Sequence, residues 1–318
     1  MSERTVSIMD SYGYGQMMED LVKLSQANTF LRLSYIGETV MGKPIPAIKV
    51  GIGERRIHYN ASFHANEWIT SLILMVFLED YTRAIRLNES IFGQQAMDLF
   101  CGSTLFIVPM VNPDGVELVQ YGTSSDHPYH ELLLQWNQGS SDFSQWKSNI
   151  RGVDLNDQYP AHWDVEKLRR GPDGPGPRDY PGDKPLSEPE AVAIAEFTKR
   201  NLYHLVMALH TQGREIYWNY RDYEPERASW MAEQLAVVSG YEAVKLTDSD
   251  AGYKDWFIQE YRRPGFTIEA GYGCNPLPIN QFNNIYEEVG PLLVLGLSLS
   301  TEGDHLIGIH SHPPSQNS

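Results

Sequence analysis

The stretch RRIHYNASFHANEWITSLILMVFLEDYTRAIRLN (55–88) changes its hydrophobic pattern part-way along. Residues 55–63 are typical of a β-strand, whereas residues 68–88 carry apolar side chains at helical spacing. His64 and Glu67 lie in the turn between the two segments. In open α/β sheets, ligands bind beyond the carboxyl ends of the strands. The stretch therefore predicts an α/β fold and marks one place in it for a site.

The rest of the chain alternates in the same way. Helical spacing is found at 17–26, at 229–240 and from about residue 279, and strand-like runs at 31–51, 103–112, 202–210 and 265–271. Ser187 and Glu190 have the spacing of a capping box, which predicts a helix up to about Arg200. The run GPDGPGPRDYPGDKP (171–185) predicts a surface loop. We expect a mostly parallel or mixed sheet with helices on both faces.

Composition excludes several classes of protein. The chain has 318 residues, of which 42% are hydrophobic, enough for a large core. With 25 basic and 41 acidic residues it lacks the basic surface of a nucleic-acid binder. Cys101 and Cys274 are too few for a disulfide framework, and we expect them to be buried in a reducing compartment. Neither a signal peptide nor a membrane span is indicated, so a cytoplasmic protein is expected, although a processed exported chain would look the same.

A third candidate ligand strengthens the pair His64 and Glu67. Alone, the pair fits equally well with a glutamate at a helix start beside a capping histidine. His210, however, ends the strand-like run 202–210, so it too is expected at the carboxyl edge of the sheet. Two histidines and one glutamate are a ligand set of catalytic zinc, which keeps a fourth position for water.

Glu269 is the candidate general base. It lies near the carboxyl end of the run GFTIEAG (265–271), where a buried carboxylate is costly unless it has a partner or a role. Zinc lowers the pKa of a bound water to about 7, and a neighbouring carboxylate can take the proton.

Seven short strings, in this order, resemble the zinc carboxypeptidase family. They are HANEW (64–68), VNPDG (111–115), RGVDLN (151–156), SEPE (187–190), LHTQ (209–212), DW (255–256) and TIEA (267–270). The resemblance implies a single-domain three-layer sandwich over residues 1–318, with a twisted mixed eight-stranded sheet and a frayed tail at about 303–318. It also implies one zinc ion on His64, Glu67 and His210, with Glu269 as the base.

The chain departs from the family at the leaving-group pocket. The family follows the asparagine of its V-D-x-N string with an arginine that grips a terminal carboxylate, whereas here Asn156 is followed by Asp157. Lys254 stands just before the Asp-Trp pair, at a position that the resemblance places on the pocket floor. Together, Asp157 and Lys254 would suit a leaving residue with both an ammonium and a carboxylate, as in meso-diaminopimelic acid. Alternatively, they pair with each other or face away.

Other substrate contacts follow from the same resemblance. Lys147 and Arg151 are both candidates for the cation that polarises the scissile carbonyl. The family's mobile tyrosine aligns near Thr247, and Tyr253 is the nearest tyrosine. Thr211, directly after His210, is also expected to bind substrate.

The strings WKSNIRGVDLN and LHTQGREIYW are similar to bacillar γ-D-glutamyl-diaminopimelate endopeptidases, in particular the cytoplasmic type without wall-binding repeats. This resemblance implies hydrolysis of the γ-D-glutamyl–meso-diaminopimelate bond of peptidoglycan stem peptides. An ordinary metallocarboxypeptidase and an N-acyl amino acid deacylase are alternatives. A non-catalytic wall-peptide binding protein is another, but the presence of all three ligands and Glu269 argues against it.

Overall fold

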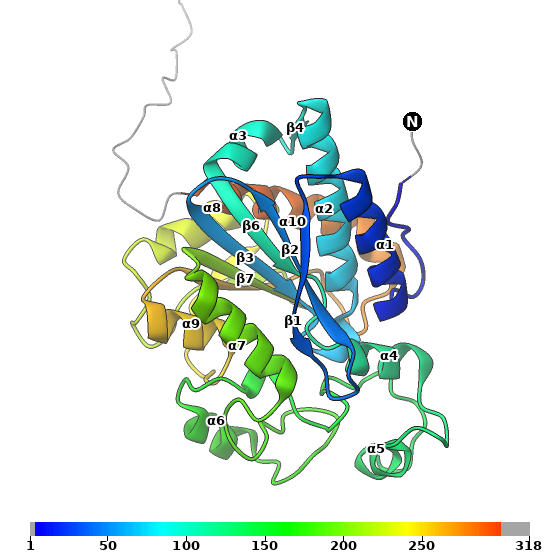
Figure 1. The fold of residues 1–318 in the computed structure, drawn as a ribbon. Helices are drawn as coiled ribbons and strands as arrows, with labels where there is room; N and C mark the ends of the chain where they lie inside the picture. Colours follow the sequence, from blue (N-terminus) through cyan, green and yellow to red (C-terminus); the bar gives the residue numbers. More distant parts are fainter. Residues whose placement is uncertain (1–3, 300–318) are drawn as a thin grey trace, which may run out of the picture.

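An eight-stranded mixed sheet runs through residues 4–299, the part that the computed structural model describes (Figure 1). The frayed tail expected at 303–318 lies outside the described residues. The strand order is β1-β2-β6-β3-β7-β10-β8-β9. The strands are β1 (Arg32–Glu38), β2 (Pro44–Gly51), β3 (Arg55–Ala61), β6 (Ser103–Val108), β7 (Leu205–His210), β8 (Glu215–Tyr217), β9 (Glu242–Val244) and β10 (Gly265–Glu269), and β4 (Ser90–Ile91) pairs with β5 (Gln94–Gln95) in a separate hairpin.

The centre of the sheet is parallel. β3 pairs in parallel with both β6 and β7, and β7 pairs in parallel with β10. All residues of β6 and β7 are buried, as expected for strands covered on both faces. Antiparallel pairs β1–β2, β2–β6 and β8–β10 flank this centre. The expected mixed eight-stranded sheet is confirmed.

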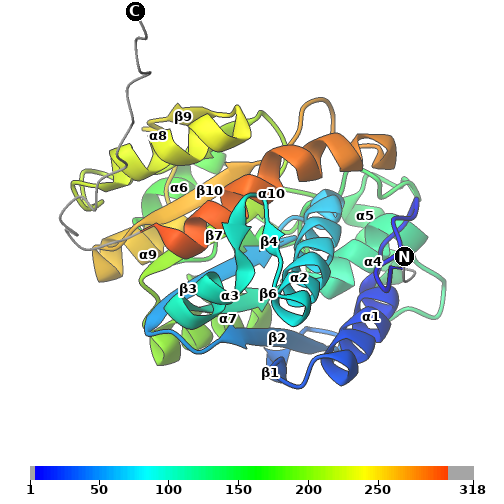
Figure 2. The same cartoon turned by 90° about the horizontal axis from the view of Figure 1, so that it is seen from above.

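Helices cover both faces of the sheet (Figures 1 and 2). Successive residues of β7 alternate between two cores: Leu205, Met207 and Leu209 pack in one, Val206 and Ala208 in the other. The first core includes α1 (Tyr14–Ala27), α2 (Ile69–Leu87), α3 (Ala96–Gly102), α8 (Ala228–Ser239) and α10 (Phe282–Ser298), and the second includes α7 (Pro189–Asn201) and α9 (Tyr253–Tyr261). The short helices are α4 (Pro113–Tyr121), α5 (His130–Trp136), α6 (Trp163–Arg170), η1 (Ala65–Glu67), η2 (Leu155–Asp157) and η3 (Ile279–Gln281).

Two sequence predictions need correction. Ser187 does not cap α7, because the helix begins at Pro189, and the Ser187 hydroxyl donates instead to Gln158 Oε1 at 3.1 Å. Cys101 and Cys274 are both exposed rather than buried.

Among residues 4–299, no helix combines the length and the apolar composition needed to cross a bilayer.

The Ser-Glu-Pro-Glu turn joins three parts of the chain. Glu188 Oε2 accepts a hydrogen bond from Asn149 Nδ2 at 2.8 Å, and Glu190 Oε1 accepts one from the backbone N–H of Val40 at 3.2 Å. Glu190 is fully buried, and this burial raises its pKa to about 7. The folded state therefore binds this proton more tightly than an ordinary carboxyl, whose pKa is 4.5. The stabilisation that Glu190 contributes to the folded state is complete below about pH 4.5 and is lost as the pH rises through about 7.

We predict that Glu190→Gln, which cannot titrate, gains free energy of unfolding relative to the natural chain as the pH rises. The gain should reach up to about 3 kcal/mol between about pH 4.5 and about pH 7.5. Urea unfolding at several pH values measures it. Glu196→Gln is the control, because Glu196 lies on the same helix but is exposed. A difference between Glu190→Gln and the natural chain that does not change with pH would contradict the prediction.

Candidate metal and active site

The fold brings His64, Glu67 and His210 together at the carboxyl edge of the sheet. His210 is the last residue of β7, and His64 follows β3 by three residues, after which η1 ends at Glu67. β3 and β7 are neighbours in parallel register, with Ala61 opposite Leu209. The two strands therefore deliver both histidines to the same point.

The three side chains converge through atoms that bind metals. His64 Nδ1 lies 2.9 Å from Glu67 Oε1, His210 Nδ1 lies 3.1 Å from Glu67 Oε2, and the two Nδ1 atoms are 3.2 Å apart. All three residues are at most 9% exposed. Two imidazole nitrogens facing each other beside a buried carboxylate need a proton or a cation between them, since two lone pairs repel. This donor set fits zinc.

Asp154 holds the first histidine in place. Its Oδ1 accepts a hydrogen bond from His64 Nε2 at 3.2 Å, which leaves Nδ1 as the ligand atom. Burial alone would raise the pKa of Asp154, but the charges of His64 and Arg170 outweigh burial and lower it. Asp154 therefore stays ionised and orients the imidazole.

Glu269 lies beside the metal ligands. It is the last residue of β10 and stands opposite His210 in the parallel register. Its carboxyl lines the same pocket as His64 and Glu67, a cavity of about 410 Å³. Desolvation by the surrounding protein is the main cause that raises the pKa of Glu269 to about 8, and the negative charge of Glu67 is the second. A carboxylate so placed can accept a proton from a water in the pocket.

The structure distinguishes between Lys147 and Arg151. Lys147 lines the pocket, with Nζ 3.5 Å from Glu67 Oε1. Arg151 does not line it: its side chain is 45% exposed, and NH1 lies 3.6 Å from Glu188 Oε2. Of these two residues, Lys147 is therefore the one that lies beside the candidate metal site. Thr211 also lines the pocket.

Asp157 and Lys254 lie outside this pocket and do not pair with each other. Asp157 is buried, with Oδ2 3.0 Å from Arg170 Nε. Lys254 is also buried, and its Nζ donates to Asn219 O at 2.7 Å and to Asp255 Oδ1. Both groups therefore already have charged protein partners that sequence reasoning did not identify, and Arg170 also contacts Glu166 and Asp179.

Asn156 and Tyr253 are not brought to the pocket either. The backbone N–H of Asn156 donates to Asp154 Oδ1 at 3.1 Å, so this residue supports Asp154. Tyr253 is fully buried, its hydroxyl lies 3.0 Å from Thr198 Oγ1, and its ring stacks on Phe63. The expectation that Tyr253 contacts substrate is therefore corrected, because the side chain is part of the core.

Several pocket residues were missed from the sequence. They are Asn66, Gln145, Arg178, Tyr217, Cys274 and Asn275. Asn275 Nδ2 donates to Glu67 Oε1 at 3.3 Å and to Thr211 O at 2.9 Å, so it supports the ligands. No periodic pattern in the sequence marks these residues, since most of them lie in irregular segments. Arg178 was the exception that could have been noticed, as a cation in the Gly- and Pro-rich run.

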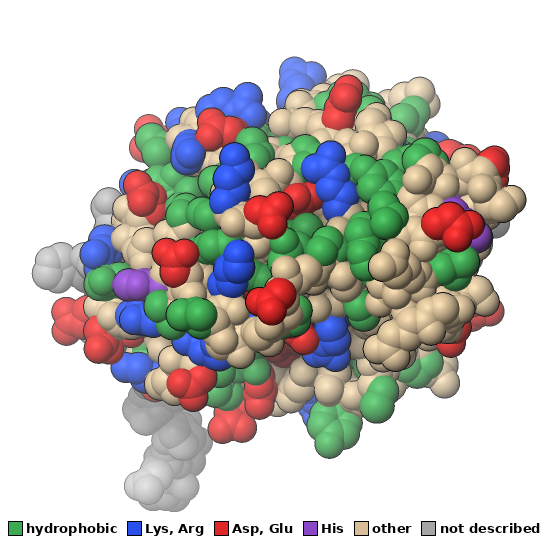
Figure 3. Space-filling view, turned by 90° about the horizontal axis from the view of Figure 1, so that it is seen from below, with side chains coloured by type: hydrophobic (Ala, Val, Ile, Leu, Met, Phe, Trp, Pro, Cys, Tyr) green, Lys and Arg blue, Asp and Glu red, His purple; other side chains and the backbone are tan. Residues whose placement is uncertain are grey.

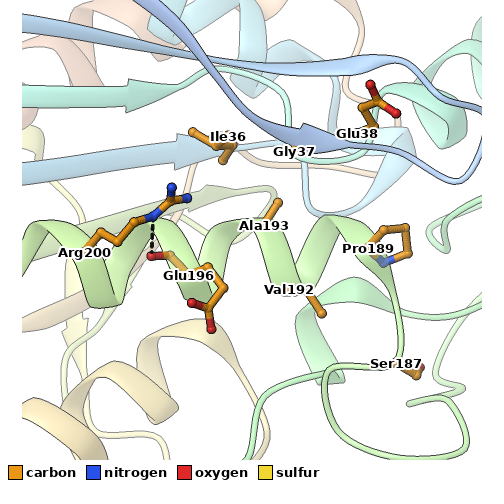
Figure 4. Close-up of a pocket in the computed structure, with 9 residues that line it drawn as sticks. All are labelled: Ile36, Gly37, Glu38, Ser187, Pro189, Val192, Ala193, Glu196 and Arg200. Atoms are coloured by element: carbon orange, nitrogen blue, oxygen red, sulfur yellow. Dashed lines mark hydrogen bonds between the residues drawn. The ribbon is translucent and has the colours of Figure 1, made fainter.

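A second hollow, of about 580 Å³, lies between β1 and α7 (Figure 4). Gly37 allows this close packing, because a Cβ there would lie 2.7 Å from Ala193 Cβ. Its lining residues include no histidine or cysteine, so size alone does not mark the active site.

On the face shown in Figure 3, basic and acidic side chains are interspersed, unlike the basic stripe of a nucleic-acid binder.

Comparison with known proteins now decides the family. The sequence profile described as zinc carboxypeptidase matches residues 17–289. This chain belongs to the zinc carboxypeptidase family. It is a zinc metallopeptidase, and His64, Glu67 and His210 form its candidate metal site.

The chain is similar in sequence to two proteins from bacteria, among others. Gamma-D-glutamyl-L-diamino acid endopeptidase 1 of Lysinibacillus sphaericus is 50% identical over 93% of this chain and 74% of that protein. YqgT of Bacillus subtilis (strain 168) is 40% identical over 89% of this chain and 76% of that protein. Thrombin activatable fibrinolysis inhibitor shares the fold, with a TM-score of 0.72 over 93% of this chain and 76% of that chain, at 18% identity.

We predict that Asp154→Asn lowers zinc affinity by about 10- to 100-fold, because the amide orients His64 less strongly than a carboxylate does. Competition with a chromophoric chelator measures the affinity. Asp98→Asn, at an exposed position on α3, should leave it unchanged. Unchanged zinc affinity in Asp154→Asn would mean that the hydrogen bond to His64 does not support the ligand.

Proposed function

We propose that this zinc metallopeptidase hydrolyses the bond between γ-linked D-glutamate and meso-diaminopimelate in peptidoglycan stem peptides. The observation that carries the proposal is 50% identity, over 93% of the chain, with gamma-D-glutamyl-L-diamino acid endopeptidase 1. meso-Diaminopimelate is joined to glutamate through its L-centre, so it is an L-diamino acid in the sense of that name. The pocket supports the proposal with a complete set of metal-binding and acid–base side chains.

The pocket residues divide the chemistry among them. A zinc ion on His64, Glu67 and His210 supplies a Lewis acid and lowers the pKa of a water. Glu269 takes a proton from the attacking water and returns it to the leaving amine, as a general base and then a general acid. Lys147 donates a hydrogen bond to the scissile carbonyl oxygen, where negative charge develops.

Two sequence predictions remain predictions. The first is that Asp157 and Lys254 bind the ammonium and the carboxylate of the leaving diamino acid. A ligand at these positions would have to displace Arg170 from Asp157, and Asp255 from Lys254. The second is the cytoplasmic location, which fractionation of cells that express the protein would test.

We predict that the purified protein releases free diaminopimelate from L-Ala-γ-D-Glu-meso-diaminopimelate. Mass spectrometry follows the products. A chelator should stop the release and added zinc should restore it, because the ligand set holds the metal reversibly. Zinc-loaded protein that releases no diaminopimelate, but acts on ordinary carboxy-terminal residues or on N-acyl amino acids, would replace this proposal by one of the alternatives.

Glu269→Gln should reduce kcat on the same peptide by at least about 100-fold while zinc content stays near one ion per chain. The amide cannot accept the proton of the water, but it keeps the shape of the pocket wall. Glu242→Gln, at an exposed position on β9, is the control. A variant at Glu269 that keeps full activity would assign the general base to another group.

A further inference from the structure

Arg178 lies in the metal pocket with room for a ligand. It lines the pocket together with Lys147 and Gln145, and its side chain is 57% exposed. Its hydrogen bond to Asp179 Oδ2, at 3.0 Å, uses Nε only. Within residues 4–299, no hydrogen bond to a protein group engages its two terminal amino groups, so they are available to a substrate.

The position of Arg178 is fixed by the backbone on both sides. Pro177 O accepts hydrogen bonds from the backbone N–H groups of Lys147, at 2.8 Å, and Ser148, at 3.1 Å. Two residues after Arg178, Tyr180 O accepts a hydrogen bond from the backbone N–H of Asp154, at 2.8 Å. The segment that carries Arg178 is therefore attached to the same stretch that supplies Lys147 and Asp154. This attachment makes Arg178 a fixed part of the site.

The charges of the pocket call for an anionic group on the substrate. Arg178 is close enough to Lys147 for their positive charges to oppose each other. Glu67, Asp154 and Glu269 offset part of this charge at Lys147, and Asp179 pairs with Arg178 through Nε. The Glu67 carboxylate is turned toward the two histidines, and the terminal amino groups of Arg178 have no acidic partner among the described residues. A substrate carboxylate near Lys147 would be held by the guanidinium in a charge-assisted hydrogen bond.

A γ-linked glutamyl group has such a carboxylate. Its α-carboxyl is free and is separated from the scissile carbonyl by three carbon atoms, a position at which, in an ordinary α-linked peptide, only a glutamate side chain would place a carboxylate. We propose that Arg178 binds this α-carboxylate and so selects γ-D-glutamyl substrates over peptides that lack a carboxylate at this distance from the scissile carbonyl. The inference rests on the proposed function. It favours the glutamyl side of the bond because Asp157 and Lys254, the residues expected at the leaving side, do not line this pocket.

Three substrates separate the two possible sources of the carboxylate. The first is L-Ala-γ-D-Glu-meso-diaminopimelate, the second has the α-carboxyl of D-glutamate amidated, and the third has both carboxyl groups of the diamino acid amidated. The zinc-loaded natural chain is compared with Arg178→Gln, Arg178→Lys and Lys184→Gln. Lys184 is the matched control, because it is an exposed cation of the same loop and does not line the pocket.

Arg178→Gln should lower kcat/KM by about 10- to 100-fold on the first and third substrates, and by less than about threefold on the second. Arg178→Lys should retain part of the activity, and Lys184→Gln nearly all of it. The product L-Ala-D-Glu should also inhibit Arg178→Gln more weakly than it inhibits the natural chain.

Equal losses on all three substrates would overturn the assignment of Arg178 and leave the proposed function standing. A loss that disappears only when the diamino acid is amidated would move Arg178 to the leaving side and would also overturn it. If the zinc-loaded natural chain cleaves none of the three, the proposed function and this inference both fail.

Discussion

The parallel pairing of β3, β7 and β10 is the constraint on which the site depends. Parallel strands end at the same edge of a sheet, so residues far apart in the chain meet there. The register places Glu269 opposite His210, and Ala61, three residues before His64, opposite Leu209. A slip of one residue along β7 would turn the His210 side chain to the opposite face of the sheet. The apolar core that holds this register therefore also sets the geometry of the metal ligands.

The burial of Glu67 has a cost that its neighbours offset. A carboxylate that is 1% exposed would be strongly unfavourable without partners. Here His64, His210 and Lys147 surround it, and they lower its pKa although burial alone would raise it. Glu269 lies near the same carboxylate and has its pKa raised. Two carboxyl groups in one pocket thus differ in their affinity for protons, which suits one as a ligand and the other as an acid–base group.

Motifs that look separate in the sequence form one network around residues 147–154. Asn149 Oδ1 accepts hydrogen bonds from the backbone N–H groups of Arg151 and Val153, while its Nδ2 donates to Glu188. The same stretch binds the loop that carries Arg178 through backbone hydrogen bonds. The position of Lys147 thus depends on the Ser-Glu-Pro-Glu turn and on the Gly- and Pro-rich loop. The loop, which composition alone described as a surface connection, contributes Arg178 to the lining of the pocket.

The sequence by itself determined the fold class, the family and the candidate metal ligands. Hydrophobic periodicity reports which strands are buried, and the positions of His64, His210 and Glu269 at strand ends report the common edge. Tertiary structure alone decided which groups pair. Asp157 pairs with Arg170 of α6, and no local pattern could show that the two side chains meet. Tyr253 packs in the core, against residues distant from it in the chain. Lys147, rather than Arg151, reaches Glu67. Periodicity is a local property, whereas the pairing of charges depends on contacts between segments distant in the chain.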